Sequence, residues 1–207
     1  MSTLDNAVEN RNAVSGSRLR KICGTAMLSA AAYVLMFLEF PVPLIPPFIK
    51  MDFSELPALI ASFAYGPLAG VAVCLVKNLI HLFNTQSGGV GELANFILGA
   101  VFVFVAGMVY GKMHNKKGAV IGALAGAVIM AAISVPGNYF IVYPVYTAFM
   151  PMEAIIGAYK AINPSVNTLL DCLLMFNMPF TFVKGLCSLV ITFLIYKPLS
   201  PMLHGYK

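Results

Sequence analysis

The chain has 207 residues, of which 59% are hydrophobic and only 10% are charged, and its mean hydropathy is +0.85. Soluble domains carry about 25% charged residues, so a soluble fold of this size could not hide so much apolar surface. The net charge of +5 requires no nucleic-acid partner, because the basic residues are distributed as membrane topology would place them. The sequence therefore predicts an all-α, multi-pass protein of the cell membrane.

Six apolar segments follow one another along the chain, and each is predicted to form a helix in the membrane. A spanning helix needs about 20 mainly apolar residues, although tilt and burial allow shorter ones. The second segment is shorter than this and is interpreted as a buried half-span. The segments run near residues 22–38, 54–64, 67–83, 91–111, 118–143 and 171–196.

The polar stretch at residues 1–17 contains no apolar run, so it is interpreted as a flexible cytosolic tail and not as a signal peptide. Residues 18–207 are predicted to form a single domain, a bundle of six transmembrane helices. Basic loops stay on the cytoplasmic side of a membrane, which places both termini in the cytoplasm. The basic residues that set this orientation are Arg11, Arg18, Arg20, Lys21, Lys112, Lys116, Lys117, Lys197 and Lys207.

Small residues recur at every fourth position in two segments, where they are predicted to let helix backbones approach closely. Ala26 and Ala30 lie on one face of the first segment, and Gly118, Gly122 and Gly126 lie on one face of the fifth. Packing within the chain is the first interpretation for both groups, and docking of another subunit is the second.

The third and fourth segments carry a group of polar side chains. Lys77 and His81 are i, i+4 neighbours, while Glu92 and Asn95 share a helix face beyond a glycine-rich turn. A structural charge network, in which Glu92 pairs with Lys77 or with another lysine, is the first interpretation, and a ligand site is the second. The turn lacks the GxxxxGK[ST] spacing of a phosphate-binding loop, and helix entry explains its glycines.

The Pro-Gly pair at residues 136–137 is expected to kink the fifth segment or to end it early. A broken helix frees backbone polar groups, which are tolerated mainly beside a cavity or another protein segment. Asn138, which directly follows the break, is therefore a candidate ligand residue. Tyr139, Tyr143 and Tyr146 are interpreted as part of an interfacial belt of tyrosines.

The last segment carries a stripe of polar side chains on an otherwise apolar helix. Asn177, Thr181 and Lys184 are spaced i, i+4, i+7, so they share one face. A charge at the centre of a bilayer costs about 2.5–3.5 kcal/mol on insertion scales, and it is tolerated where it faces protein, a wet cavity or a ligand. The stripe therefore predicts contact with a polar ligand, and a structural ion pair or helix–helix hydrogen bond is the alternative.

Signatures of an enzyme are missing from the sequence. It has no GxSxG, no HExxH and no pair of histidines with metal-ligand spacing. The four cysteines are scattered and are interpreted as small core residues. No catalytic residue, metal site or cofactor is therefore expected. The chain also has no ATP-binding loop, so energy for transport would have to come from another subunit.

Four blocks of the sequence resemble the riboflavin-specific S components of energy-coupling factor (ECF) transporters. The blocks are PPFIKMDFSELPALIASFAYGPLAG, VKNLIHLF, GGVGELANFILG and PFTFVKG, and the resemblance covers residues 19–196. It implies a six-helix membrane bundle that binds a vitamin from the outside, beneath the proline-rich loop at residues 39–52. It also implies a membrane T subunit and two ATPase subunits as partners, with Ala26 and Ala30 matching the motif that docks the T subunit.

The resemblance also implies roles for individual residues. Lys184 and Asn138 match residues that contact the vitamin's polar part, whereas Thr181 stands where the family has an asparagine. Lys50 and Asp52 match a block that positions the loop and contacts the ligand. Among the expected ligand-binding residues, the apolar ones suit the flat ring of riboflavin, and the polar ones suit its ring carbonyls and hydroxyls. The expected ligand-binding residues are Leu44, Phe48, Lys50, Asp52, Glu92, Asn95, Asn138, Tyr139, Thr181 and Lys184.

The sequence thus predicts the substrate-binding subunit of an ECF transporter, which captures riboflavin for ATP-driven uptake, with FMN and flavin analogues as further candidates. Riboflavin is expected as the transported ligand and not as a cofactor. One alternative is an S component for another vitamin. Another is a membrane-embedded enzyme that uses Glu92, His81 and Lys77. A purely structural bundle, which would bind no small molecule, is the third.

Overall fold

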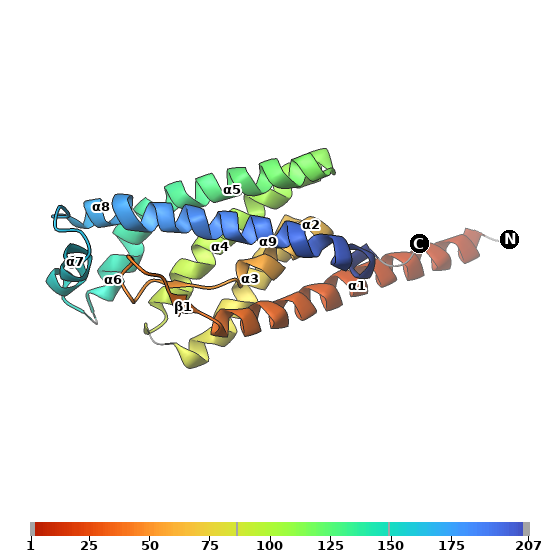
Figure 1. The fold of residues 1–207 in the computed structure, drawn as a ribbon. Coiled ribbons are helices and arrows are strands. Elements are labelled where there is room, and N and C mark those ends of the chain that lie inside the picture. The colour runs from red at the N-terminus through yellow and green to blue at the C-terminus, as the bar shows by residue number, and fades with distance from the viewer. Residues whose placement is uncertain (1–2, 86, 149, 205–207) are drawn as a thin grey trace.

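The computed structural model describes residues 3–85, 87–148 and 150–204 and is mainly helical (Figure 1). Short 3-10 and π turns interrupt or extend several helices, and a two-stranded antiparallel hairpin follows the first helix. The elements in chain order are α1 (Thr3–Phe37), β1 (Phe40–Pro41), β2 (Lys50–Met51), α2 (Glu55–Tyr65), α3 (Pro67–His81), the 3-10 turn η1 (Leu82–Asn84), α4 (Val90–Met113), α5 (Lys116–Gly137), the π turn η2 (Asn138–Val142), α6 (Tyr143–Tyr146), α7 (Met152–Lys160), α8 (Leu169–Cys172), the π turn η3 (Leu173–Asn177) and α9 (Met178–His204).

Within the described residues, five helical stretches are long and apolar enough to cross a membrane, so the chain is a multi-pass membrane protein. They are Gly16–Phe37, Pro67–Asn84, Val90–Met113, Lys116–Tyr146 and Leu169–Ile195. The remaining predicted segment forms α2, whose 11 residues extend only about 16 Å at 1.5 Å per residue. Nine of those 11 residues are buried, which agrees with the expectation of a buried, shortened helix.

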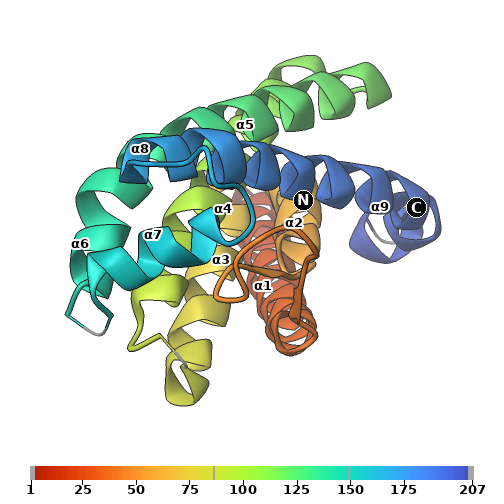
Figure 2. The same ribbon diagram turned by 60° about the vertical axis from the view of Figure 1, so that its left-hand side comes forward.

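The bundle has two distinct ends (Figure 1). The hairpin, α6, α7 and α8 gather at one, which we call the cavity end, while α1 begins and α9 finishes at the other, the terminal end. Figure 2 shows α7 and the hairpin loop crossing the cavity end beside each other. The helix α1 begins at Thr3, within the stretch expected to be a flexible tail, and the division into tail and domain stays a prediction.

Glycines in α5 let its backbone lie directly against α4. A Cβ atom on Gly122 would come within 2.6 Å of the Ala106 carbonyl oxygen, and one on Gly126 would come equally close to that of Phe102. Both distances are shorter than any Cβ contact seen in real structures, so only glycine fits at these two positions. The spacing of glycines in this segment therefore serves packing within the chain, as the first interpretation held.

The α-helical hydrogen-bonding pattern of α5 ends at Gly137, directly after Pro136, as the sequence predicts. The chain does not leave the helix there. It passes through the wider π turn η2, in which the Tyr143 N–H reaches the Asn138 carbonyl, and then enters α6. The second π turn, η3, lies at the start of the last long helix, where the Met178 N–H reaches the Leu173 carbonyl. Both wide turns therefore belong to the cavity end.

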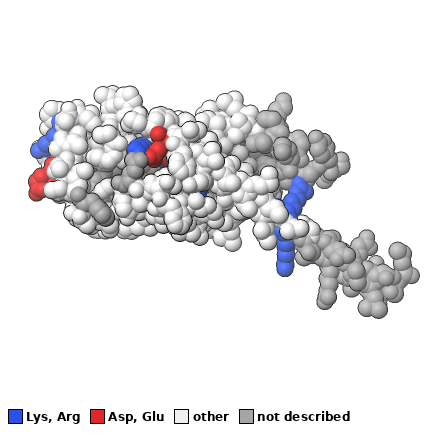
Figure 3. All heavy atoms as spheres, turned by 90° about the horizontal axis from the view of Figure 1, so that it is seen from below, with Lys and Arg blue, Asp and Glu red and all other residues white. Residues whose placement is uncertain are grey.

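Charged residues are sparse on the outside of the molecule. Figure 3 shows a face on which most of the surface carries neither Lys or Arg nor Asp or Glu, with the few charges gathered in small groups. Large apolar side chains are exposed along the helices instead, among them Met27, Val34, Leu68 and Leu194, which are 71%, 60%, 74% and 72% exposed. Such a surface is compatible with a lipid surrounding and not with water.

Candidate ligand-binding cavity

A cavity of about 460 Å³ lies at the cavity end, between the hairpin loop and helices α3, α4, α5 and α9. Its volume is within the range of about 300–1,000 Å³ that is typical of small-molecule sites. Its walls combine large apolar side chains with a limited number of polar ones, which is the composition that such sites usually have. The apolar walls include Phe48, Leu98, Met130 and Phe180.

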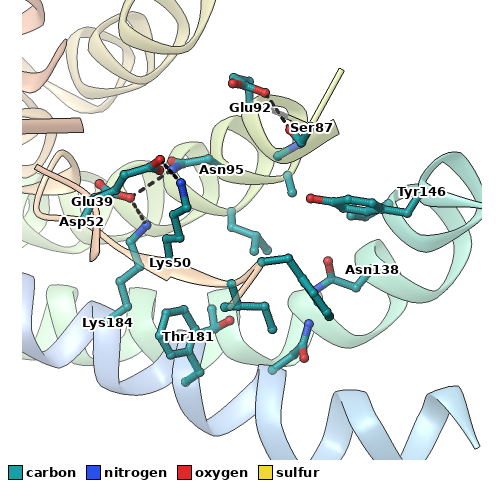
Figure 4. A pocket seen from close by; sticks show the side chains of 18 of the residues that line it. Glu39, Lys50, Asp52, Ser87, Glu92, Asn95, Asn138, Tyr146, Thr181 and Lys184 are labelled. Carbon is teal, nitrogen blue, oxygen red and sulfur yellow. Dashed lines mark hydrogen bonds and ion pairs between the residues drawn. The ribbon is translucent and has the colours of Figure 1, made fainter. Parts of the chain in front are cut away.

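The cavity brings together all but two of the residues that the sequence predicted for ligand binding. Figure 4 shows Lys184, Asp52 and Asn95 on one side of the cavity and Asn138 on another, with Thr181 between them. The predicted residues that line the cavity are Phe48, Lys50, Asp52, Glu92, Asn95, Asn138, Thr181 and Lys184. Residues separated by more than 130 positions in the chain thus face one space, which local spacing alone could not establish.

Two predicted residues lie elsewhere. Leu44, at the tip of the hairpin loop, is 79% exposed and has a positive φ of 65°, so its side chain points away from the cavity walls. Tyr139 is 41% exposed, and its ring packs edge-on against Phe140 at a centroid distance of 5.0 Å. It follows Asn138 directly, and consecutive residues in a helical turn point in different directions.

Lys184 is held by two carboxylates. Its Nζ atom lies 2.8 Å from Asp52 Oδ2 and 3.3 Å from Glu55 Oε2, and its side chain is only 12% exposed. Burial alone would raise the pKa of Asp52, but the ammonium groups of Lys184 and Lys77 outweigh burial and hold that pKa well below its usual range. Lys184 thus both forms the ion pair given as the alternative and lines the cavity.

Lys77 belongs to the same charge network but not to the cavity wall. It is fully buried, its Nζ atom lies 3.1 Å from Glu55 Oε1, and it donates further hydrogen bonds to Ser54 and to Asn95 Oδ1. Two ammonium groups therefore face two carboxylates, so the buried network is electrically neutral. The structural interpretation is the right one for Lys77.

Glu92 pairs with His81 and not with a lysine. Its Oε1 atom lies 2.8 Å from His81 Nδ1, and its Oε2 atom accepts hydrogen bonds from the hydroxyls of Thr85 at 2.9 Å and Ser87 at 3.2 Å. The expected pairing with Lys77 is wrong, because Lys77 is already occupied by Glu55. Both His81 and Glu92 line the cavity, and Figure 4 shows Glu92 on a different side from Lys184.

Several cavity residues were missed or misread from the sequence. Tyr143 and Tyr146 line the cavity, and Tyr143 is only 3% exposed, so the assignment of Tyr143 to an interfacial belt is wrong. The hydroxyl contacts of Tyr143 within the protein, described below, explain its burial. Glu55 also lines the cavity, and its Oε2 atom accepts no hydrogen bond among the described residues. The sequence signal that could have identified Glu55 is its place in the block PPFIKMDFSELPALIASFAYGPLAG, directly after Asp52, Phe53 and Ser54.

The hairpin covers the cavity and is fastened at its base. Phe40 pairs with Met51 and Pro41 with Lys50 in the antiparallel register, and Lys50 Nζ forms an ion pair with Glu39. Phe48, from the loop of the hairpin, packs edge-on against Tyr159 of α7 at a centroid distance of 5.8 Å. The loop is therefore tied both to its own strands and to the helix that crosses the same end of the bundle.

Comparison with known proteins agrees with this arrangement. Residues 20–196 match the family model "ECF transporter, substrate-specific component". The chain is 31% identical to "Riboflavin transporter RibU" of Staphylococcus aureus (strain TCH60) over 95% of its length and 98% of that protein. It is 34% identical to "Riboflavin transporter FmnP" of Bacillus subtilis (strain 168), over 92% and 97% of the two chains. A solved structure, "Structure and mechanism of the S component of a bacterial ECF transporter", superposes with a TM-score of 0.72 at 31% identity, covering 90% of this chain and 98% of the other.

Proposed function

Because the chain belongs to the family of substrate-specific components of ECF transporters, we propose that its cavity captures riboflavin for uptake into the cell. The protein is a transporter component and not an enzyme, and riboflavin enters as the substrate and not as a cofactor. The observation that carries the proposal is the convergence of Asn138, Thr181 and Lys184 on one cavity with apolar walls.

The chemistry of riboflavin suits this cavity. Its flat tricyclic ring matches the apolar walls formed by Phe48, Leu98, Met130 and Phe180, where burial of apolar surface supplies affinity. Its ring carbonyls and hydroxyl chain require donors and acceptors at fixed positions. Asn138, Thr181 and Lys184 can donate hydrogen bonds, and the carboxylate of Glu55, which also lines the cavity, can accept one.

Orientation in the membrane follows from the basic residues. We place the terminal end in the cytoplasm, because Lys112 in the last turn of α4 and Lys116 and Lys117 at the start of α5 lie at that end. The cavity end then faces outward, and α2 completes a bundle of six membrane helices. The hairpin loop over the cavity acts as its gate, with Phe48 as the side chain that closes against the ligand.

Energy coupling requires further subunits, since ECF transport is driven by ATP. We assign the T-subunit docking surface to α1, where Ala26 and Ala30 are exposed on one side of the helix. Small side chains there leave room for the backbone of a partner helix. Two ATPase subunits complete the proposed complex, and docking alternates with release as the ligand shifts the population of outward and docked states.

Titration calorimetry of the purified protein with riboflavin, FMN, thiamine and biotin tests the proposal. Saturable binding of riboflavin with one site, and no heat with thiamine or biotin, is the expected result. A yellow colour in protein purified without added ligand would support the same conclusion. Binding of thiamine or biotin in preference to riboflavin would assign the protein to another vitamin.

A further inference from the structure

Two tyrosines and an asparagine form a closed ring of hydrogen bonds at the cavity end. Tyr159 Oη donates to Asn177 Oδ1 at 2.6 Å, Asn177 Nδ2 donates to Tyr143 Oη at 3.1 Å, and the two tyrosine hydroxyls are hydrogen-bonded to each other. All three side chains are buried, at 0%, 7% and 3% exposure for Tyr159, Asn177 and Tyr143. We call this group the Tyr-Asn ring.

The direction of each hydrogen bond in the Tyr-Asn ring can be assigned. A tyrosine hydroxyl has a single proton, so Tyr159, which gives its proton to Asn177, must accept the proton of Tyr143. The two distances agree with this orientation of the amide, because 2.6 Å is typical of an O–H···O bond and 3.1 Å of an N–H···O bond. Each hydroxyl therefore donates once and accepts once, and a flip of the amide would require both hydroxyls to reverse their direction of donation.

The ring leaves part of the Asn177 amide unused. Nδ2 carries two protons and gives one to Tyr143, and Oδ1 has two lone pairs and offers one to Tyr159. One N–H donor and one lone pair remain. Asn177 lines the cavity one helical turn from Thr181, on the same face as Lys184. A buried amide in a cavity wall, with one unused donor and one unused lone pair, is suited to forming hydrogen bonds with a polar group on a ligand.

We propose that Asn177, held in one orientation by Tyr143 and Tyr159, is a specificity-determining residue that reads the carbonyl and N–H edge of the bound tricyclic ring. The proposal rests on the proposed function and names the side chain that supplies the amide at this part of the site. Thr181 occupies the position where an asparagine was expected, and a hydroxyl cannot offer the fixed donor and acceptor of an amide. Asn177 supplies that pair from one turn away.

Tyr159 is a positioning residue in this arrangement and does not line the cavity. It comes from α7, outside the long helices, and it connects three separate parts of the cavity end. Its hydroxyl joins the end of η3 to the residue that follows η2, and its ring supports Phe48 of the hairpin loop. Burial raises the pKa of Tyr159, so its hydroxyl keeps its proton and the amide keeps its orientation across the physiological pH range.

The experiment measures riboflavin affinity, by quenching of flavin fluorescence, and the absorption spectrum of the bound flavin at saturation. The variants are Asn177→Leu, Tyr159→Phe and the two combined. Asn78→Leu is the matched control, because Asn78 is a buried asparagine that does not line the cavity and that donates a hydrogen bond to the Cys74 carbonyl. Thermal unfolding without ligand confirms that each variant is folded.

We expect Asn177→Leu to weaken binding about tenfold and to shift the absorption spectrum of the bound flavin, since a hydrogen bond from Asn177 to the tricyclic flavin ring is lost. Tyr159→Phe should weaken binding about threefold to tenfold in the native background but add nothing in the Asn177→Leu background, because it acts through Asn177. Tyr159→Phe changes one atom only, so it keeps the test valid if Asn177→Leu does not fold.

Equal effects of Asn177→Leu and Asn78→Leu on affinity, or an unchanged spectrum in every variant, would overturn the inference. An effect of Tyr159→Phe that is the same with and without Asn177 would overturn the positioning role. Wild-type protein that binds no riboflavin would overturn the proposed function itself. Failure of the inference and failure of the proposed function are therefore distinguishable, because only failure of the proposed function is seen in the unaltered protein.

Discussion

The ammonium group of Lys184 in α9 lies 2.8 Å from Asp52 Oδ2, although the two residues are 132 positions apart in the chain. Asp52 lies between the hairpin and α2, so this ion pair fastens the base of the proposed gate to the last helix. The same pair forms one wall of the cavity. Stability and ligand binding are therefore expected to depend on the same two side chains.

Replacing Lys184 by Met should destabilise the protein strongly. Breaking a buried ion pair costs about 3–5 kcal/mol, because the remaining carboxylate stays buried without its partner. Glu39→Gln is the control, since it removes the partly exposed pair with Lys50, which should cost about 1 kcal/mol or less. Thermal unfolding in detergent compares the two. Equal shifts in the unfolding temperature would contradict the assignment of Lys184 to a buried network.

The stability contributed by Asp52 should be independent of pH until strongly acid conditions. Its pKa is lowered in the folded protein from an ordinary value of 3.8, so its ionised form stabilises the fold fully above that value. This stabilisation is lost as the pH falls below the ordinary value and through the lower folded one. The difference in unfolding temperature between wild type and Asp52→Asn should therefore be constant above about pH 5 and shrink below about pH 4. A difference that changes near neutral pH would contradict the predicted direction.

Gly126→Ala should force α4 and α5 apart. The new Cβ atom would meet the Phe102 carbonyl oxygen at 2.6 Å, and overpacking of this kind costs about 1–3 kcal/mol. Gly111→Ala in α4 is the matched control, because no atom lies within 4 Å of its Cβ position. That change should stabilise the helix by about 0.5–1 kcal/mol. Thermal unfolding of both variants gives opposite signs if the described helix contact is right.

Leu44→Asn should stabilise the hairpin loop without changing riboflavin affinity. A leucine in the left-handed region, here at φ 65°, is strained by about 1–2 kcal/mol, and asparagine adopts this conformation more easily. Leu44 does not line the cavity, whereas Phe48 in the same loop does, so Phe48→Ala should weaken binding. Unfolding temperature and binding affinity are measured for both. Loss of affinity in Leu44→Asn would restore Leu44 to the ligand site.

Ala30→Leu should abolish coupled uptake while leaving riboflavin binding intact. The added side chain projects from the exposed face of α1 and would keep the proposed partner helix away. Ala31→Leu is the control, because Ala31 is also exposed but lies on an adjacent face of the same helix. Uptake of labelled riboflavin is measured in cells that express the coupling subunits. Similar uptake by both variants would exclude this face as the docking surface.

Local periodicity predicted much of this protein. The apolar segments, the end of α5 at Gly137 and the shared face of Asn177, Thr181 and Lys184 all follow from properties of neighbouring residues. Such signals need no knowledge of how the segments pack. The resemblance to a known family then predicted a ligand site beneath the proline-rich loop, where the structure has a cavity.

Contacts between distant segments could not be read in this way. Spacing along the chain does not show which residues Lys77 and Glu92 pair with. In the packed structure Lys77 pairs with Glu55, and Glu92 pairs with His81. The sequence predicted Tyr143 to be an interfacial residue, but in the structure its hydroxyl is hydrogen-bonded to the hydroxyl of Tyr159 in α7. Such pairings depend on where helices cross, and a single sequence does not contain that information in any local pattern.

The fully buried residues beneath the cavity have a further consequence for release of the cargo. Ala58 and Leu59 follow the cavity residue Glu55 by one turn of α2, Phe102 and Val103 follow the cavity residue Leu98 by one turn of α4, and all four are at 0% exposure. The packed core therefore closes this side of the cavity, and a ligand could pass through it only if the core residues moved apart. The proposed cargo is therefore expected to enter and leave the cavity past the hairpin loop.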